Sequence, residues 1–314
     1  MHDSWERVSP PRAGYKHREL TVAGLPAGKT SPRGEEHRFG AREMTVGTSH
    51  PHTSKAGPET VSEQTWRCAG KGEPILLEAF VPEIGAGARP GVILLHGRDG
   101  PNSLVGDRTH RDLARSIATR GFVAVLPHYF DRTAGRAEGN DPGELGRFGW
   151  EIEQFGIWIE TVGEVLEDVA SRSVIDPMRL GCLGFSLGAY LALTVGMTGG
   201  RVRAVVEWSG GVPTPFAPSA RRLPPTLVLH GDSDDVVAVS EAHALIKLLR
   251  YHRIAHEMRI YPGAGHGFTG ADAADALERT VTFLEDYLSG AGSSPSAMIQ
   301  KSWFRFRFGR RGRA

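Results

Sequence analysis

The stretch that decides the fold is Leu180-Gly181-Cys182-Leu183-Gly184-Phe185-Ser186-Leu187-Gly188, an apolar run that ends in a glycine-flanked serine. A helix-like run, 189–197, follows directly, so the pattern predicts a strand that reverses sharply into a helix. The glycines leave room for the crowded backbone, and the helix N-terminus directs N–H groups toward the serine. The pattern indicates that Ser186 is a nucleophile. The alternative is a helix that merely begins with a serine cap.

A second strand, predicted over 226–229, ends in an acidic turn that contains Asp232, Asp234 and Asp235. Acidic turns at strand ends are commonly only solvated. A nucleophilic serine, however, requires a histidine base and a carboxylate that orients it, and a carboxylate that follows the serine fits that order. We expect Asp234 in this role, with Asp232 and Asp235 facing water or capping the next helix.

The histidine of such a set is expected at His266, in the glycine-rich loop Tyr261-Pro262-Gly263-Ala264-Gly265-His266-Gly267-Phe268. A chain with 13 histidines places some on loops without function. His266 nevertheless follows both Ser186 and Asp234, which completes the order serine, aspartate, histidine. We therefore expect the imidazole to serve as the base for the serine hydroxyl.

A strand predicted over 91–95 ends in His96-Gly97-Arg98. In this arrangement the turn after that strand supplies one N–H group for a developing oxyanion, and the residue after the nucleophile supplies another. We assign these roles to the backbone N–H groups of Arg98 and Leu187. His96 is expected to brace the loop through a hydrogen bond, with an acid or chelating role as the alternative.

Composition sets the general class. The 314 residues are 40% hydrophobic and carry a formal net charge of +1, which fits a globular chain without electrostatic bias toward nucleic acid or membranes. Two cysteines, Cys68 and Cys182, indicate no disulfide framework. We find no apolar run long enough to cross a bilayer and no signal-peptide pattern, so the expected location is the cytoplasm.

Three regions are expected along the chain. Residues 1–60 are polar and glycine- and proline-bearing, which predicts a disordered extension whose histidines form no compact metal-ligand set. Residues 61–290 form the predicted catalytic domain. Residues 291–314 form a flexible tail with six cations and four aromatic residues from Lys301 onward. The tail suits nucleic acid or lipid headgroups, but a tail without consequence is the favoured interpretation.

Strands and helices alternate through the central region, which predicts an α/β fold with a mainly parallel sheet covered by helices on both faces. After an opening hairpin at 64–68 and 74–81, strands are expected at 91–95, 122–126, 180–185, 202–207, 226–229 and 257–261. Helices are expected at 107–119, 151–171, 187–195, 240–251 and 272–288.

Between about residues 61 and 288 the chain resembles the dienelactone hydrolase family of the α/β-hydrolases. The resemblance rests on the Gly-Phe-Ser-Leu-Gly motif, on Leu126-Pro127-His128-Tyr129-Phe130-Asp131-Arg132, on the acidic turn and on Gly265-His266-Gly267-Phe268. Lactone hydrolases of the family commonly use a cysteine nucleophile helped by a glutamate at the position of Gly97. Because this chain has Ser186, His266 becomes indispensable.

The resemblance also implies a clamp of two arginines on a substrate carboxylate. Arg132 matches one position and Gly270 the other, so the clamp is at most half present, and Arg98 is the candidate to compensate. Phe130, Trp208 and the segment 148–159, with Trp150, Phe155 and Trp158, are expected to wall the pocket. For Trp158 an ordinary core position is the stronger interpretation.

Together these features predict a serine hydrolase that cleaves a small carboxylic ester or lactone through an acyl-enzyme, without metal or cofactor. Two alternatives stay open: a peptidase or acyltransferase on the same scaffold, and a non-catalytic binding protein that kept the fold. The sequence does not fix the oligomeric state or the physiological substrate.

Overall fold

The structure is a computed structural model that describes residues 60–83, 87–133 and 143–288, with side chains from residue 154 onward in the last range. The expected N-terminal extension 1–60, apart from Thr60, lies outside the described residues. The basic tail 291–314 and the side chain of Trp150 also lie outside them.

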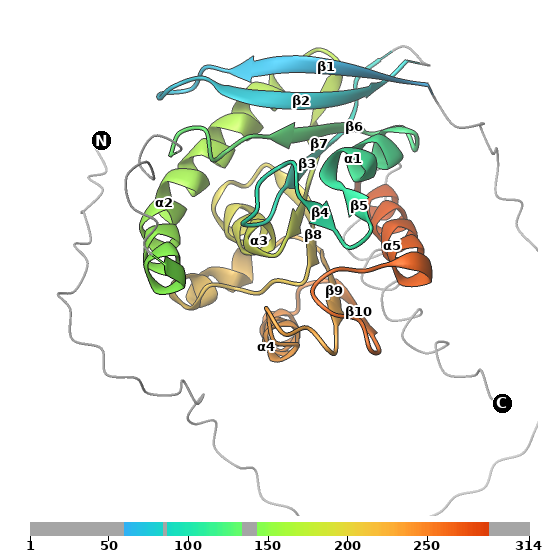
Figure 1. Cartoon of the computed structure of the whole chain (residues 1–314). Helices are drawn as coiled ribbons and strands as arrows, with labels where there is room; N and C mark the ends of the chain where they lie inside the picture. The colour runs from blue at the N-terminus through green and yellow to red at the C-terminus, as the bar shows by residue number, and fades with distance from the viewer. Residues whose placement is uncertain (1–59, 84–86, 134–142, 289–314) are drawn as a thin grey trace, which may run out of the picture. The chain divides into compact units, whose positions relative to one another are not determined.

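The described residues form an eight-stranded sheet with the order β1-β2-β6-β3-β7-β8-β9-β10 (Figure 1). All neighbours from β6 to β10 are parallel, whereas β2 is antiparallel to both β1 and β6. The prediction of a mainly parallel sheet is therefore confirmed, as is the opening hairpin. The strands are β1 (Val61–Cys68), β2 (Ile75–Pro82), β3 (Arg89–Leu95), β6 (Val123–Pro127), β7 (Ile175–Phe185), β8 (Val202–Trp208), β9 (Thr226–Gly231) and β10 (His256–Tyr261).

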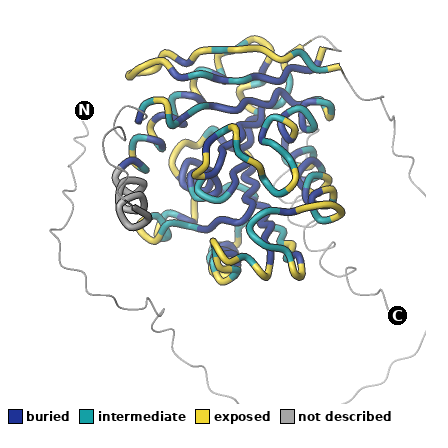
Figure 2. Tube along the Cα trace, viewed as in Figure 1, coloured by how far each residue is buried: buried dark blue, intermediate teal, exposed yellow. Residues whose placement is uncertain are grey.

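Helices cover both faces of this sheet because its central strands are apolar on both sides. Along β3, Ile93 and Leu95 pack into a core with residues of α2 (Gly143–Ala170), α3 (Leu187–Thr198) and α4 (Ser240–Tyr251). The alternate residues Val92 and Leu94 pack against α1 (His110–Ala118) and α5 (Gly270–Leu288). This two-residue alternation follows from strand geometry. Figure 2 shows the resulting continuous burial of the central strands.

Two helices begin three or more residues away from the expected start. The helix expected at 107–119 begins only at His110, because 104–109 form a short hairpin of β4 (Leu104–Val105) and β5 (Arg108–Thr109). Thr109 and Asp112 then start α1 with a reciprocal capping box. The long helix α2 begins at Gly143, eight residues before the expected start at 151.

A 3₁₀ helix, Thr214–Arg222, was not predicted. Pro215 and Pro218 lack the N–H groups that a longer α-helix would need, which explains why no helical pattern was evident. Within the described residues, no helix combines the length and apolar character needed to span a membrane. Cys68 and Cys182 are both buried free thiols.

Candidate active site

Ser186 lies at the junction of β7 and α3, with a strained backbone (φ 52°, ψ −119°). The flanking glycines make this reversal possible. A Cβ on Gly184 would lie 2.2 Å from the Gly188 oxygen, and one on Gly188 would lie 2.1 Å from the Leu95 oxygen. Side chains are therefore excluded at both positions. A non-glycine residue at positive φ costs about 1–3 kcal/mol and is characteristic of functional sites.

Asp234, in the turn after β9, holds His266 in the loop after β10. The Nδ1–H of His266 donates to the Asp234 carboxylate, at 2.9 Å from Oδ2 and 3.1 Å from Oδ1. Oδ1 also accepts from the N–H groups of Val236 and Val237, at 2.9 and 2.8 Å. The Asp234 side chain is fully buried, whereas that of His266 is 27% exposed. Asp234 thus orients the His266 ring through Nδ1, and part of the ring remains exposed.

The electrostatics keep this carboxylate ionised. Burial alone would raise the pKa of Asp234, but the hydrogen bonds from the Val237 N–H and from His266 outweigh it and lower the pKa below its ordinary value. Of the three aspartates of the turn, Asp234 is the one that contacts His266. Asp232 instead accepts from the Gly263 N–H at 2.7 Å, and Asp235 is exposed.

Ser186 and His266 line the same cavity, which has a volume of about 1000 Å³. Arg98, Leu187 and Trp208 line it as well. The turn after β3 lies beside the serine, because a Cβ on Gly97 would be 3.5 Å from the Ser186 Cβ. Much of the remaining wall is apolar and includes Leu104, Phe155, Ile159, Phe216, Val236 and Val237.

Arg132 and Phe130 are not among the described residues that line this cavity. Arg132 forms an ion pair with Glu164 on α2, and its Nε–H donates to the Glu73 carbonyl oxygen at 3.0 Å. This placement argues against the expected contact of Arg132 with a substrate carboxylate. Phe130 packs against the rings of His96 and Trp158, with centroid distances of 4.7 Å to each.

Trp158 is fully buried in the core, the favoured interpretation from the sequence. His96 braces its own turn. Its Nδ1–H donates to the Gly97 oxygen at 2.8 Å, its ring stacks on Tyr129 at 4.1 Å, and burial lowers its pKa to about 3. The ring is therefore neutral at physiological pH.

Sequence reasoning missed two buried groups beside the cavity. Glu207 on β8 is fully buried, and burial raises its pKa to about 8, with Asp234 and Glu241 adding to the rise. Its Oε2 accepts from the Gly210 N–H at 2.8 Å. The signal was a single acid, directly after the apolar run Ala204-Val205-Val206. His110 lines the cavity wall, where burial lowers its pKa to about 4. No pattern in the sequence distinguishes His110 from the other histidines.

No three His, Cys, Asp or Glu side chains of the described residues lie close enough to share a metal ion.

Comparison with known proteins identifies the family. The chain matches the model of the dienelactone hydrolase family over residues 78–288. A Synechocystis sp. protein named "Putative carboxymethylenebutenolidase" is 25% identical over 201 residues, which cover 59% of this chain and 78% of that protein.

Solved structures show the same fold. A Klebsiella pneumoniae protein described as "Putative Dienelactone Hydrolase" superposes with a TM-score of 0.62 at 21% identity, covering 73% of this chain and all of that one. A dienelactone hydrolase-like promiscuous phosphotriesterase from metagenomic libraries gives 0.61 at 19% identity, covering 72% of this chain and 98% of that one. The family match spans well over half of the sequence and agrees with the resemblance of the motifs; the chain belongs to the dienelactone hydrolase family.

Proposed function

We propose that this hydrolase cleaves a carboxylic ester or lactone through an acyl-enzyme on Ser186. One observation carries the proposal: Ser186, on a strained strand-to-helix reversal, and His266, held by the buried Asp234, line one cavity. A strained serine that shares a cavity with an oriented imidazole is the arrangement that activates a hydroxyl for acyl transfer.

In the acylation step, the Ser186 Oγ attacks the carbonyl carbon of the substrate while His266 Nε2 takes the hydroxyl proton. The N–H groups of Arg98 and Leu187 receive the oxyanion that forms. Collapse of the tetrahedral intermediate breaks the bond to the leaving alkoxide, which takes the proton from His266. The acyl group remains on Ser186.

In the deacylation step, water attacks the acyl carbon and gives its proton to His266, which returns it to Ser186 as the acid departs. For a lactone, the alkoxide stays part of the same molecule, so the product is a hydroxy acid. Asp234 remains ionised throughout and stabilises the imidazolium, in keeping with its lowered pKa.

The cavity favours an apolar acyl or aryl group. The cavity wall carries aromatic and branched side chains, and two of these, Leu104 and Val236, are 65% and 64% exposed. Such surfaces gain free energy by covering apolar groups of a ligand. The buried, unpaired thiols of Cys68 and Cys182 are in keeping with a reducing compartment, so we place the protein in the cytoplasm.

The test is the variant Ser186→Ala. We expect it to lose hydrolysis of p-nitrophenyl acetate and labelling by a fluorophosphonate probe while it keeps the wild-type circular dichroism spectrum. Ser209→Ala is the matched control, because Ser209 lines the same cavity and has the same φ of 52°. If labelling were lost in Ser209→Ala but kept in Ser186→Ala, Ser209 would be the nucleophile.

The rival functions predict different outcomes. A peptidase or acyltransferase would favour amide substrates or transfer to an added acceptor in a panel of esters, lactones, amides and thioesters. A non-catalytic binding protein would show neither labelling nor turnover in the wild type.

A further inference from the structure

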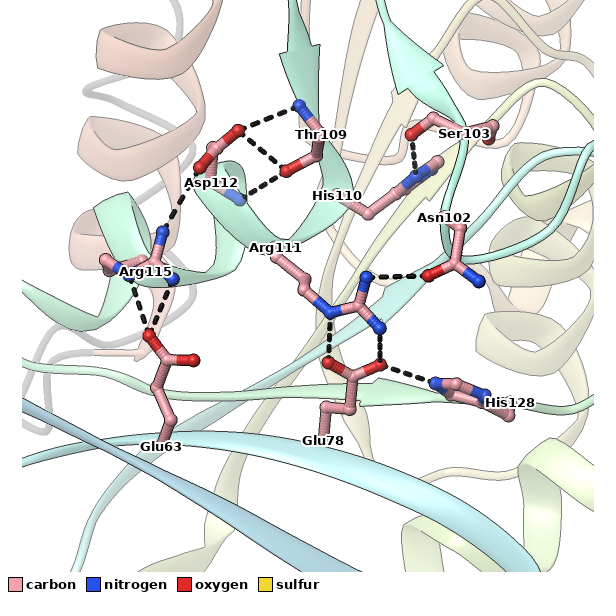
Figure 3. A network of polar contacts seen from close by, with 10 residues as sticks. All are labelled: Glu63, Glu78, Asn102, Ser103, Thr109, His110, Arg111, Asp112, Arg115 and His128. Carbon is pink, nitrogen blue, oxygen red and sulfur yellow. Dashed lines mark hydrogen bonds and ion pairs between the residues drawn. The ribbon is translucent and has the colours of Figure 1, made fainter.

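A chain of charged and polar side chains connects β2 to the turn after β3 by way of α1 (Figure 3). Glu78 on β2 binds the guanidinium of Arg111 through both carboxylate oxygens, with Nη2 at 2.6 Å from Oε1. Arg111 then donates from Nη1 to the Asn102 side-chain oxygen, also at 2.6 Å. His128, which follows β6, donates from Nε2 to Glu78 at 2.6 Å.

The turn that Arg111 reaches is the one that carries the Arg98 backbone N–H. It folds back on itself, because the Gly100 N–H donates to the Gly97 oxygen at 3.2 Å and the Ser103 hydroxyl donates to the Gly100 oxygen at 2.7 Å. Its N-terminal end is held by the Tyr129 hydroxyl, which donates to the His96 oxygen at 2.6 Å. Its C-terminal end is held by α1, where Asn102 meets Arg111.

The β2 end of this chain of contacts is largely buried, whereas the Arg111 side chain is 36% exposed. The Glu78 and His128 side chains are 17% and 15% exposed. Burial alone would raise the pKa of Glu78, but the hydrogen bonds from Arg111 and His128 outweigh it and lower the pKa. The carboxylate therefore stays ionised and fixes the planar guanidinium at two points.

We propose that Glu78 and Arg111 are positioning residues that hold the 97–103 turn, through Asn102, where the Arg98 N–H meets the oxyanion. The inference rests on the proposed function. An N–H donor stabilises an oxyanion only at a defined distance, so a small shift of the turn lowers the rate of the chemical step. Ground-state binding in the apolar cavity depends much less on that donor.

The same helix provides a matched comparison. Arg115, one turn further along α1, binds Glu63 on β1 at 2.9 Å from Nε and 2.6 Å from Nη2 (Figure 3). Both pairs fasten α1 to the β1–β2 hairpin. The Glu63–Arg115 pair does not continue to the turn after β3, and its side chains are 50% and 43% exposed.

The experiment compares Arg111→Met with Arg115→Met, and adds Asn102→Ala and Asn102→Asp, with p-nitrophenyl acetate as substrate. We expect Arg111→Met and Asn102→Ala to lose about tenfold in kcat, with KM within about twofold of the wild type. Arg115→Met should keep the wild-type kcat. Asn102→Asp keeps the acceptor oxygen for Arg111, so it should restore kcat to within about threefold.

Three results would overturn the proposal: unchanged kcat in Asn102→Ala, an equal loss in Arg115→Met, or no recovery in Asn102→Asp. Asn102 is exposed, so we expect its variants to fold. They therefore test the proposal even if Arg111→Met does not fold. The rate of fluorophosphonate labelling gives a second readout, since it should fall in parallel with kcat. A wild type that neither labels nor turns over refutes the proposed function itself, which is a different result.

Discussion

Gly106 lies directly against the carbonyl oxygen of Phe268, so that a Cβ on Gly106 would be 1.7 Å from that oxygen. The contact is reciprocal, because a Cβ on Gly267 would lie 2.5 Å from the Gly106 nitrogen. The β4–β5 hairpin after the Arg98 turn is thereby packed onto the loop that carries His266. Two parts of the candidate site that are far apart in the sequence share this backbone contact.

Gly106→Ala should therefore disturb both parts. Gly106 has a φ of 68°, and the added methyl group has no space beside Phe268. We expect kcat/KM to fall at least about tenfold, because the His266 loop must shift. Gly200→Ala is the control, since Gly200 has a φ of 64° and nothing within 4 Å of the new methyl group. It should lose only about 1 kcal/mol of stability, with normal turnover. Equal kinetics in the two variants would show that the contact has no role.

Asp234→Asn tests the orientation of His266. The asparagine oxygen can still accept from Val236 and Val237, but its NH₂ group then faces the His266 Nδ1 and favours the wrong tautomer. We expect kcat to fall by about 10³- to 10⁴-fold for ester hydrolysis. Asp235→Asn changes the exposed neighbour by the same atoms and should leave kcat unchanged. If Asp234→Asn lowered kcat only slightly, a residue other than Asp234 would orient His266.

Local patterns were sufficient to predict much of the fold. The glycines around Ser186 predicted the reversal because their requirement is local, and alternating apolar strands and helices predicted a mainly parallel sheet. The chain order of Ser186, Asp234 and His266 also pointed to residues that lie together in the structure. Ser186 and His266 line one cavity, and Asp234 is hydrogen-bonded to His266.

Features that depend on contacts between distant residues were not predictable. The family motif indicated Arg132 as a substrate contact. In the structure Arg132 instead pairs with Glu164 on α2. The two residues are far apart in the sequence, so no local pattern predicts the pair. Likewise, the capped start of α1 depends on the hairpin at 104–109, whose strands are two residues each, too short to give a periodic pattern.

Glu207 should make stability depend on pH. Its pKa is about 8 in the folded chain, against an ordinary value of 4.5. Below pH 4.5 the carboxyl is neutral in both states, so it contributes no pH dependence. Between pH 4.5 and 8 the unfolded chain releases this proton while the folded chain keeps it, so the free energy of unfolding falls as pH rises. Above pH 8 the penalty is constant.

Glu207→Gln removes this dependence, because the amide stays neutral. Relative to the wild type, the variant should gain stability between pH 5 and 8, by an amount on the order of a few kcal/mol. Urea unfolding at several pH values measures the difference. Glu73→Gln, the same change at an exposed site, should keep the wild-type profile. A pH profile of Glu207→Gln parallel to that of the wild type would mean that Glu207 ionises normally when folded.

Arg132→Gln separates a structural role from substrate binding. The Arg132 and Glu164 side chains are 9% and 19% exposed, so removing the arginine leaves a largely buried carboxylate without its cation. We expect a loss on the order of 3 kcal/mol in the free energy of unfolding. The double variant Arg132→Gln, Glu164→Gln should recover part of that loss, because the uncompensated charge is gone.

The kinetic expectation for Arg132→Gln is an unchanged preference between substrates. Below its unfolding temperature, the variant should keep the wild-type ratio of kcat/KM for a neutral ester and for an ester with a free carboxylate. Arg98 lines the cavity, so Arg98→Gln is the variant expected to change that ratio, by about tenfold against the charged ester. If kcat/KM fell selectively for the charged ester in Arg132→Gln, Arg132 would be a substrate contact after all. Glu164 would then have to release Arg132 when the substrate binds.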